Sequence, residues 1–62
     1  MRKKEGKVYD AVRGLLQQAG FSELRTLEVA TLNRGPDHLI ILQGETIGEY
    51  NHVSRHLSLY EN

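Results

Sequence analysis

The first third of the chain has the hydrophobic spacing of an amphipathic helix. Apolar residues recur at helical intervals along one stripe, formed by Val8, Ala11, Val12, Leu15, Leu16 and Ala19. Gly20 follows this stripe directly and predicts the left-handed position of a Schellman motif, with Phe21 next in the chain packing on Leu16. The start is less well marked, because no Ser, Thr, Asp or Asn precedes the stripe as an N-cap.

The rest of the chain predicts strands separated by turns. Four runs rich in Leu, Ile, Val and Thr are typical of strands, at residues 24–32, 38–43, 46–50 and 55–60. Three connections have the composition of turns, namely Asn33–Asp37, Gly44-Glu45 as a type II′ turn, and Asn51–Ser54. The expected fold class is α+β, with a single N-terminal helix packed on one face of a three- to four-stranded antiparallel β-meander (αββββ).

The two later turns also predict which face of the sheet each side chain occupies. With Gly44-Glu45 at the turn, Ile41 pairs with Gly48 and Leu39 with Tyr50. The face under the helix is then expected to hold Leu39, Ile41, Gly48, Tyr50, Leu57 and Leu59. Gly48 fits there because a strand glycine lets another backbone approach closely, here that of the helix. The first strand has no comparable anchor for its register.

The opposite face is expected to bind a partner, because one helix covers only one face. Ile40, Leu42 and Ile47 would lie there beside Tyr60, and contiguous apolar patches mark interaction sites. At about 25 cal/mol per Å², hiding three aliphatic side chains is worth several kcal/mol, comparable with the stability of a small domain. The expected function is therefore a protein-interaction or homodimerisation module, with the interface Ile40, Leu42, Ile47, Glu49, His56 and Tyr60. The alternative is an ordinary half-exposed sheet face.

Length and composition narrow the class of protein. The 62 residues form one small domain (1–62), and with no Cys there is no disulfide framework, thiolate metal site or cysteine nucleophile. The longest apolar run, Leu39–Leu42, is too short to cross a bilayer, so no membrane partner is expected. No apolar segment follows the basic start as in a signal peptide, so we expect a cytoplasmic protein. Its size fits a standalone bacterial or phage-type small protein.

The zero net charge conceals an asymmetry along the chain. Residues 1–25 contain six basic and three acidic residues, whereas residues 26–62 contain two basic and five acidic ones. The alternative function is therefore a nucleic-acid-associated accessory protein, whose phosphate contacts would be Arg2, Lys3, Lys4, Lys7 and Arg13. Neutral overall charge and the lack of a second helix for a helix-turn-helix speak against it. If these basic residues do not bind nucleic acid, we expect residues 1–5 to be a basic tail that frays from the helix.

No motif supports catalysis or metal binding. His52 and His56 flank a predicted turn, where Asp37 and Glu49 are expected opposite them, but no further protein ligand converges there. The segment Gly44–Gly48 lacks the Lys of a phosphate-binding loop, and none of the serines has the setting of a nucleophile. We therefore expect a protein that is not an enzyme and uses no metal, cofactor or small-molecule substrate.

Overall fold

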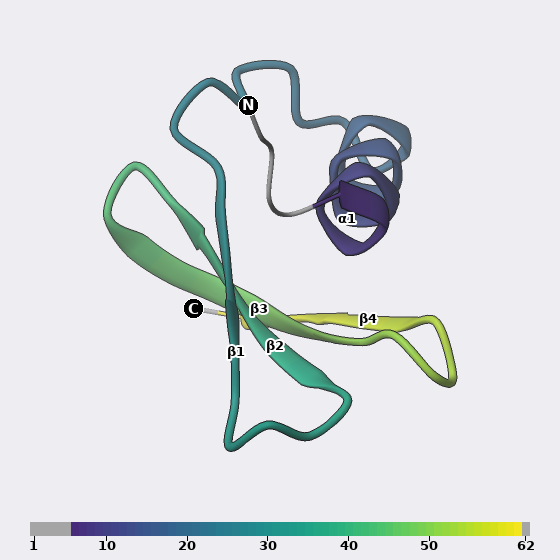
Figure 1. Cartoon of the computed structure of the whole chain (residues 1–62). Coiled ribbons are helices and arrows are strands. Elements are labelled where there is room, and N and C mark those ends of the chain that lie inside the picture. The colour runs from purple at the N-terminus through teal and green to yellow at the C-terminus, as the bar shows by residue number, and fades with distance from the viewer. Residues whose placement is uncertain (1–5, 62) are drawn as a thin grey trace.

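The computed structural model describes residues 6–61 and confirms the α+β meander. Helix α1 (Gly6–Gln18) is followed by an antiparallel sheet in the order β1-β2-β3-β4. The strands are β1 (Glu28–Thr31), β2 (Asp37–Leu42), β3 (Glu45–Asn51) and β4 (His56–Leu59). The helix lies on one side of the sheet (Figure 1). In the described part of the chain, no helix is long and apolar enough to cross a membrane.

The predicted end of the helix is confirmed. The amide of Phe21 donates to the carbonyl of Leu16 at 2.9 Å, and that of Gly20 to Gln17 at 3.1 Å. Gly20 takes a φ of 105°, which glycine adopts without steric cost. These two bonds are the pair that defines a Schellman motif. They turn the chain back toward the sheet and lead it into the segment that carries Leu24 and Leu27.

The core is a single layer between α1 and the sheet. Its buried apolar residues come in pairs from the helix, from the segment that follows it and from the sheet, and they are Val12, Leu16, Leu24, Leu27, Ile40 and Tyr50. Partly buried side chains such as Val29, Leu57 and Leu59 extend the layer. Because so few side chains are fully buried, each of them carries a large share of the apolar burial.

The turn between β2 and β3 lies one residue earlier than predicted. Gln43 and Gly44 are its central residues, both with positive φ (55° and 79°), as a type I′ turn requires. The type II′ turn expected at Gly44-Glu45 is therefore wrong, and Leu42 pairs with Glu45. The amide of Gln43 donates to Thr26 Oγ1 at 2.8 Å, which holds this residue in the left-handed region.

This shift moves the residues of β2 to the other face of the sheet. Ile40 pairs with Gly48, whereas Ile41 pairs with Thr46, so Ile47 is an extra residue in a β-bulge. Ile40 is fully buried in the core, and Leu42 and Ile47 pack against that core. The predicted exposed patch of Ile40, Leu42 and Ile47 is therefore wrong, because a one-residue slip exchanges the two faces of a strand.

The β3–β4 register keeps its predicted faces. Gly48 pairs with Leu59 rather than with Leu57. Because this shift is two residues, Leu57 and Leu59 stay on the helix side, as expected. Gly48 allows the close approach of a different element from the one predicted. A Cβ at this position would collide with the carbonyl oxygen of Ser58 and lie 3.0 Å from the Cα of Leu59, so it is β4, not the helix, that needs the glycine.

Two Gly→Ala substitutions are expected to change stability in opposite directions. Gly48→Ala should lower the free energy of unfolding by about 2 kcal/mol, because β4 must move away from the new methyl group. Gly14→Ala, in α1 with open space around the new Cβ, should raise it by about 1 kcal/mol through helix propensity. Urea denaturation followed by circular dichroism measures both. A Gly48→Ala protein as stable as wild type would contradict the close approach of β4.

Candidate functional site

The sheet face turned away from α1, here called the outer face, has an apolar centre and an acidic rim. Strand pairing arranges it in three cross-strand rows, which are Glu28–Ile41–Thr46, Ala30–Leu39–Glu49–Ser58 and Asp37–Asn51–His56. Leu39 and Ile41 are adjacent on this face and are half-buried, although α1 lies on the other side (Figure 1). Glu28, Asp37 and Glu49 surround them, so the outer face offers apolar contact inside a ring of carboxylates.

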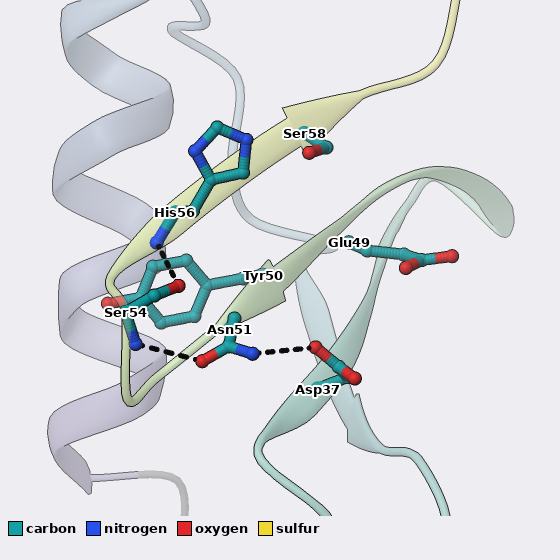
Figure 2. A pocket seen from close by; sticks show the side chains of 7 residues that line it. All are labelled: Asp37, Glu49, Tyr50, Asn51, Ser54, His56 and Ser58. Atoms are coloured by element: carbon teal, nitrogen blue, oxygen red, sulfur yellow. Dashed lines mark hydrogen bonds between the residues drawn. The ribbon is translucent and has the colours of Figure 1, made fainter.

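A shallow hollow of about 520 Å³ lies at one end of the outer face (Figure 2). It is lined mostly by polar residue types from β2, β3, β4 and the turn between the last two, namely Asp37, Glu49, Tyr50, Asn51, Ser54, His56 and Ser58. Figure 2 shows the ring of Tyr50 pointing toward α1 and the side chain of Glu49 pointing away from it. The hollow therefore belongs to the outer face, and the carboxylates of Asp37 and Glu49 are part of its lining.

The side chain of Asn51 fixes the geometry of this hollow. Its Oδ1 accepts hydrogen bonds from the amides of Val53 and Ser54, both at 2.9 Å. Its Nδ2 donates to Asp37 Oδ1 at 3.0 Å (Figure 2). One side chain thus holds the β3–β4 turn and orients the carboxylate of Asp37 across the neighbouring strand. Asn is suited to this position because its short amide can bond to backbone amides two and three residues ahead.

Tyr60 lies at the margin of the outer face, where its side chain is 51% exposed. Its hydroxyl donates to Glu49 Oε2 at 2.7 Å, and its amide donates to the carbonyl of Ile47 at 2.8 Å. The hydrogen bond to the Glu49 carboxylate raises the pKa of Tyr60 above its usual value, with smaller contributions from desolvation and the negative charge of Glu49. The ring is therefore tethered beside the acidic rim.

The structure separates the predicted interface residues into two groups. Glu49, His56 and Tyr60 lie on or beside the outer face, whereas Ile40, Leu42 and Ile47 face the helix. The sequence interpretation missed Leu39 and Ile41. Both belong to the same apolar run, and only the register decides which alternate set faces outward.

The predicted phosphate contacts are only partly within the described residues. Arg2, Lys3 and Lys4 lie outside residues 6–61, as does the whole of the predicted basic tail, residues 1–5. Lys7 and Arg13 are exposed on α1, away from the outer face. The described part of this cluster is therefore a helix surface on the other side of the sheet from the acidic rim.

A histidine pair, formed by buried His38 and exposed His52, joins β2 to the β3–β4 turn on the helix side. His38 is only 6% exposed, and its Nε2 lies 2.8 Å from Nδ1 of His52. Its Nδ1 lies 3.5 Å from Thr31 Oγ1. Burial lowers the pKa of His38 below its usual 6.5, and the charge of His52 adds to this, while Asp37 acts in the opposite direction. The carboxylate neighbours predicted for the histidines are wrong, since Asp37 bonds to Asn51 and Glu49 pairs with Ser58.

Neither similarity to known proteins nor a group of metal ligands indicates what this site binds. Among residues 6–61, no three His, Asp or Glu side chains are grouped so that they could hold a metal ion. No protein-family model matches the chain, and neither a curated protein nor a solved structure is significantly similar to it. The function therefore has to be argued from the shape and charge of the surfaces.

The histidine pair predicts that acid destabilises the protein. Unfolded chains protonate a histidine near pH 6.5, whereas folded His38 takes up its proton only at lower pH. Below about pH 6.5 the unfolded state thus binds more protons and gains stability relative to the folded state, and this contribution of His38 is fully favourable only above that pH. Urea denaturation between about pH 5.5 and 7.5 measures the slope.

The matched variants for this prediction are His38→Gln and His56→Gln. His38→Gln should make the dependence of unfolding free energy on pH shallower, because the shifted group is gone. His56→Gln, which makes the same substitution at an exposed position, is the variant with which the slope of His38→Gln is compared. If His38→Gln retains the full slope, the loss of stability arises from groups other than His38.

Proposed function

We propose that the protein is a small, non-enzymatic interaction module whose outer face binds a protein segment that is both apolar and basic. The observation that carries this proposal is the adjacency of Leu39 and Ile41 on the sheet face that α1 does not cover. Carboxylates surround these two side chains. The protein acts in the cytoplasm in this proposal, in keeping with the Cys-free composition.

The apolar centre supplies the free energy of binding. Leu39 and Ile41 lie in neighbouring rows of one strand, and Ala30 extends the patch onto β1. Their remaining exposed area would be removed from water by an apolar partner surface, at about 25 cal/mol for each Å². Aliphatic residues at an uncovered face are otherwise a liability for a small domain, which supports an occupant for this face.

The acidic rim selects the charge of the partner. Glu28, Asp37 and Glu49 occupy the three rows of the outer face, and among the strand residues that form these rows His56 is the only basic one. The hollow that Asp37 and Glu49 help to line is open, and its carboxylates suit the end of a Lys or Arg side chain. Electrostatic complementarity therefore favours a basic segment, because carboxylates steer such a partner and repel acidic ones.

The same charges disfavour a second copy as the occupant. In a two-fold symmetric dimer the same patch meets itself. The outer faces of both copies would then bring their carboxylates together, which costs binding free energy. The homodimer expected from the sequence is thus the weaker form of this proposal, and the solution mass decides between the two forms. The acidic rim likewise makes the outer face unsuitable for nucleic-acid phosphates.

A helical peptide of alternating Leu and Lys faces is the probe for the proposed partner. Titrated into the labelled protein, it should shift the amide resonances of β2, β3 and β4, whereas a matched peptide with Glu in place of Lys should not bind. Leu39→Lys should weaken binding at least about tenfold, because it places a cation at the centre of the contact. Val53→Lys is the matched control, since Val53 is 73% exposed and lies in the β3–β4 turn outside the outer face.

Two outcomes would contradict the proposed partner. Equal loss of binding in Leu39→Lys and Val53→Lys would mean that the peptide responds to net charge alone. A dimer in sedimentation equilibrium that Leu39→Lys dissociates and Val53→Lys leaves intact would make a second copy the occupant. In either case the variants must keep the wild-type circular dichroism spectrum, because Val53 is exposed and half-buried Leu39 lies outside the core under α1.

A further inference from the structure

A second hollow lies on the helix side of the sheet, between the first two turns of α1 and the β3–β4 turn. This groove encloses about 270 Å³, and its lining residues are Lys7, Val8, Ala11, Tyr50, His52 and Arg55. Val8, Ala11 and the buried ring of Tyr50 provide apolar walls. Lys7 and Arg55 contribute two positive charges from opposite sides, one from the helix and one from the turn.

The electrostatics of this groove are the reverse of those of the outer face. Among residues 6–61, no acidic side chain lines this groove, and the first turn of α1 carries none either. The helix adds the partial positive charge of its N-terminal amides. The sheet carboxylates Glu28, Asp37 and Glu49 belong to the rows of the other face. A negative group in the groove would therefore meet cations on both sides without a competing carboxylate from the lining.

The turn that carries Arg55 is held rigidly. The amide of Arg55 donates to the carbonyl of Asn51 at 2.7 Å, and that of His52 donates to Pro36 at 3.0 Å. The imidazole of His52 is bonded to buried His38. These contacts place the backbone of Arg55 and the imidazole of His52 before any ligand arrives, which reduces the entropy lost on binding.

Arg55 itself occupies a backbone conformation that favours glycine. Its φ is 64°, in the left-handed region where a residue with a Cβ costs about 1 kcal/mol or more. Gly or Asn would serve the turn better if the turn were the only requirement. A strained residue with a charged side chain at a groove is a reason to look for a role of that side chain.

We propose that this groove binds a small organic anion, with a carboxylate, phosphate or sulfonate between Lys7 and Arg55 and an apolar body against Val8, Ala11 and Tyr50. Charge-assisted hydrogen bonds would hold the anionic head. The enclosed volume lies just below the usual range of about 300–1,000 Å³ for drug-sized ligands, which limits the body to about one ring. The site is separate from the outer face and opposite to it in charge, so it goes beyond the proposed interaction module.

Benzenesulfonate tests this site, because it combines a ring with a charge that does not titrate near neutral pH. Added to the labelled protein, it should shift the amide resonances of residues 7–11 and 52–55 with a dissociation constant of about 1 mM, as expected of few contacts. Benzyl alcohol has the ring without the charge and should bind much more weakly. Equal binding of the two compounds, or no localised shifts, would overturn the proposal.

Two arginines in the same backbone conformation give a matched pair of variants. Arg55→Gly should weaken benzenesulfonate about tenfold while stabilising the fold, because it removes the charge and relieves the positive φ. Arg34→Gly, at a φ of 60° in the β1–β2 turn, should stabilise the fold similarly and leave binding unchanged. Lys7→Gln should weaken binding as Arg55→Gly does. If Arg34→Gly weakens binding equally, the anion responds only to net charge and the proposal fails.

The last experiment tests a single-stranded oligothymidylate, because the phosphates of nucleic acid are anions that Lys7 and Arg55 could also bind. If the oligonucleotide binds through Lys7 and Arg55 while benzenesulfonate produces no shifts, the groove is part of a nucleic-acid surface and the small-anion proposal is overturned. Benzenesulfonate binding without oligonucleotide binding supports the proposal as stated. None of these results depends on the Leu/Lys peptide, so failure here and failure at the outer face are distinguishable.

Discussion

The register of the β2–β3 hairpin decides which side chains this protein hides and which it offers to others. One helix covers one face, so every residue of β2 is either core or surface, and a shift of one position exchanges the two sets. The type I′ turn at Gln43-Gly44, held by the hydroxyl of Thr26, selects the arrangement in which Ile40 is buried. In a core this small, loss of such a side chain costs several kcal/mol, which is most of the stability of a small domain.

The register of this hairpin determines both which side chains are buried and which charges surround the exposed ones. Once Ile40 faces the helix, its neighbours Leu39 and Ile41 face outward among Glu28, Asp37 and Glu49. The cations that border the groove come instead from α1 and from the β3–β4 turn. The zero net charge of the chain therefore hides two surfaces of opposite sign. Each surface combines apolar contact with one sign of charge, and this pairing is what gives a binding surface both affinity and selectivity.

Helix, meander and helix end follow from local signals, and the structure confirms all three. The apolar stripe, Gly20 and the turn residues each act within a few positions of the chain. The prediction of the residues on the outer face is wrong because Gly44 fits two turns. It suits a type II′ turn as the first central residue and a type I′ turn as the second. Composition does not distinguish these two turns, and the bulge at Ile47 leaves no trace in the alternation. The His38–His52 pair and the groove depend on residues far apart in sequence, which only the folded chain brings together.

The two surfaces share one end of the sheet, and this limits how independent they are. Asp37 and His38 are neighbours in the chain, yet Asp37 faces the outer hollow while His38 faces the helix. Asn51 and His52 divide in the same way, with Asn51 bonded to Asp37 and His52 bonded to His38. The same two backbone segments thus position a carboxylate on one face and an imidazole pair on the other. A change that loosens this end disturbs both surfaces, whereas a change of a side chain on one face alone, such as Leu39 or Arg55, leaves the other in place.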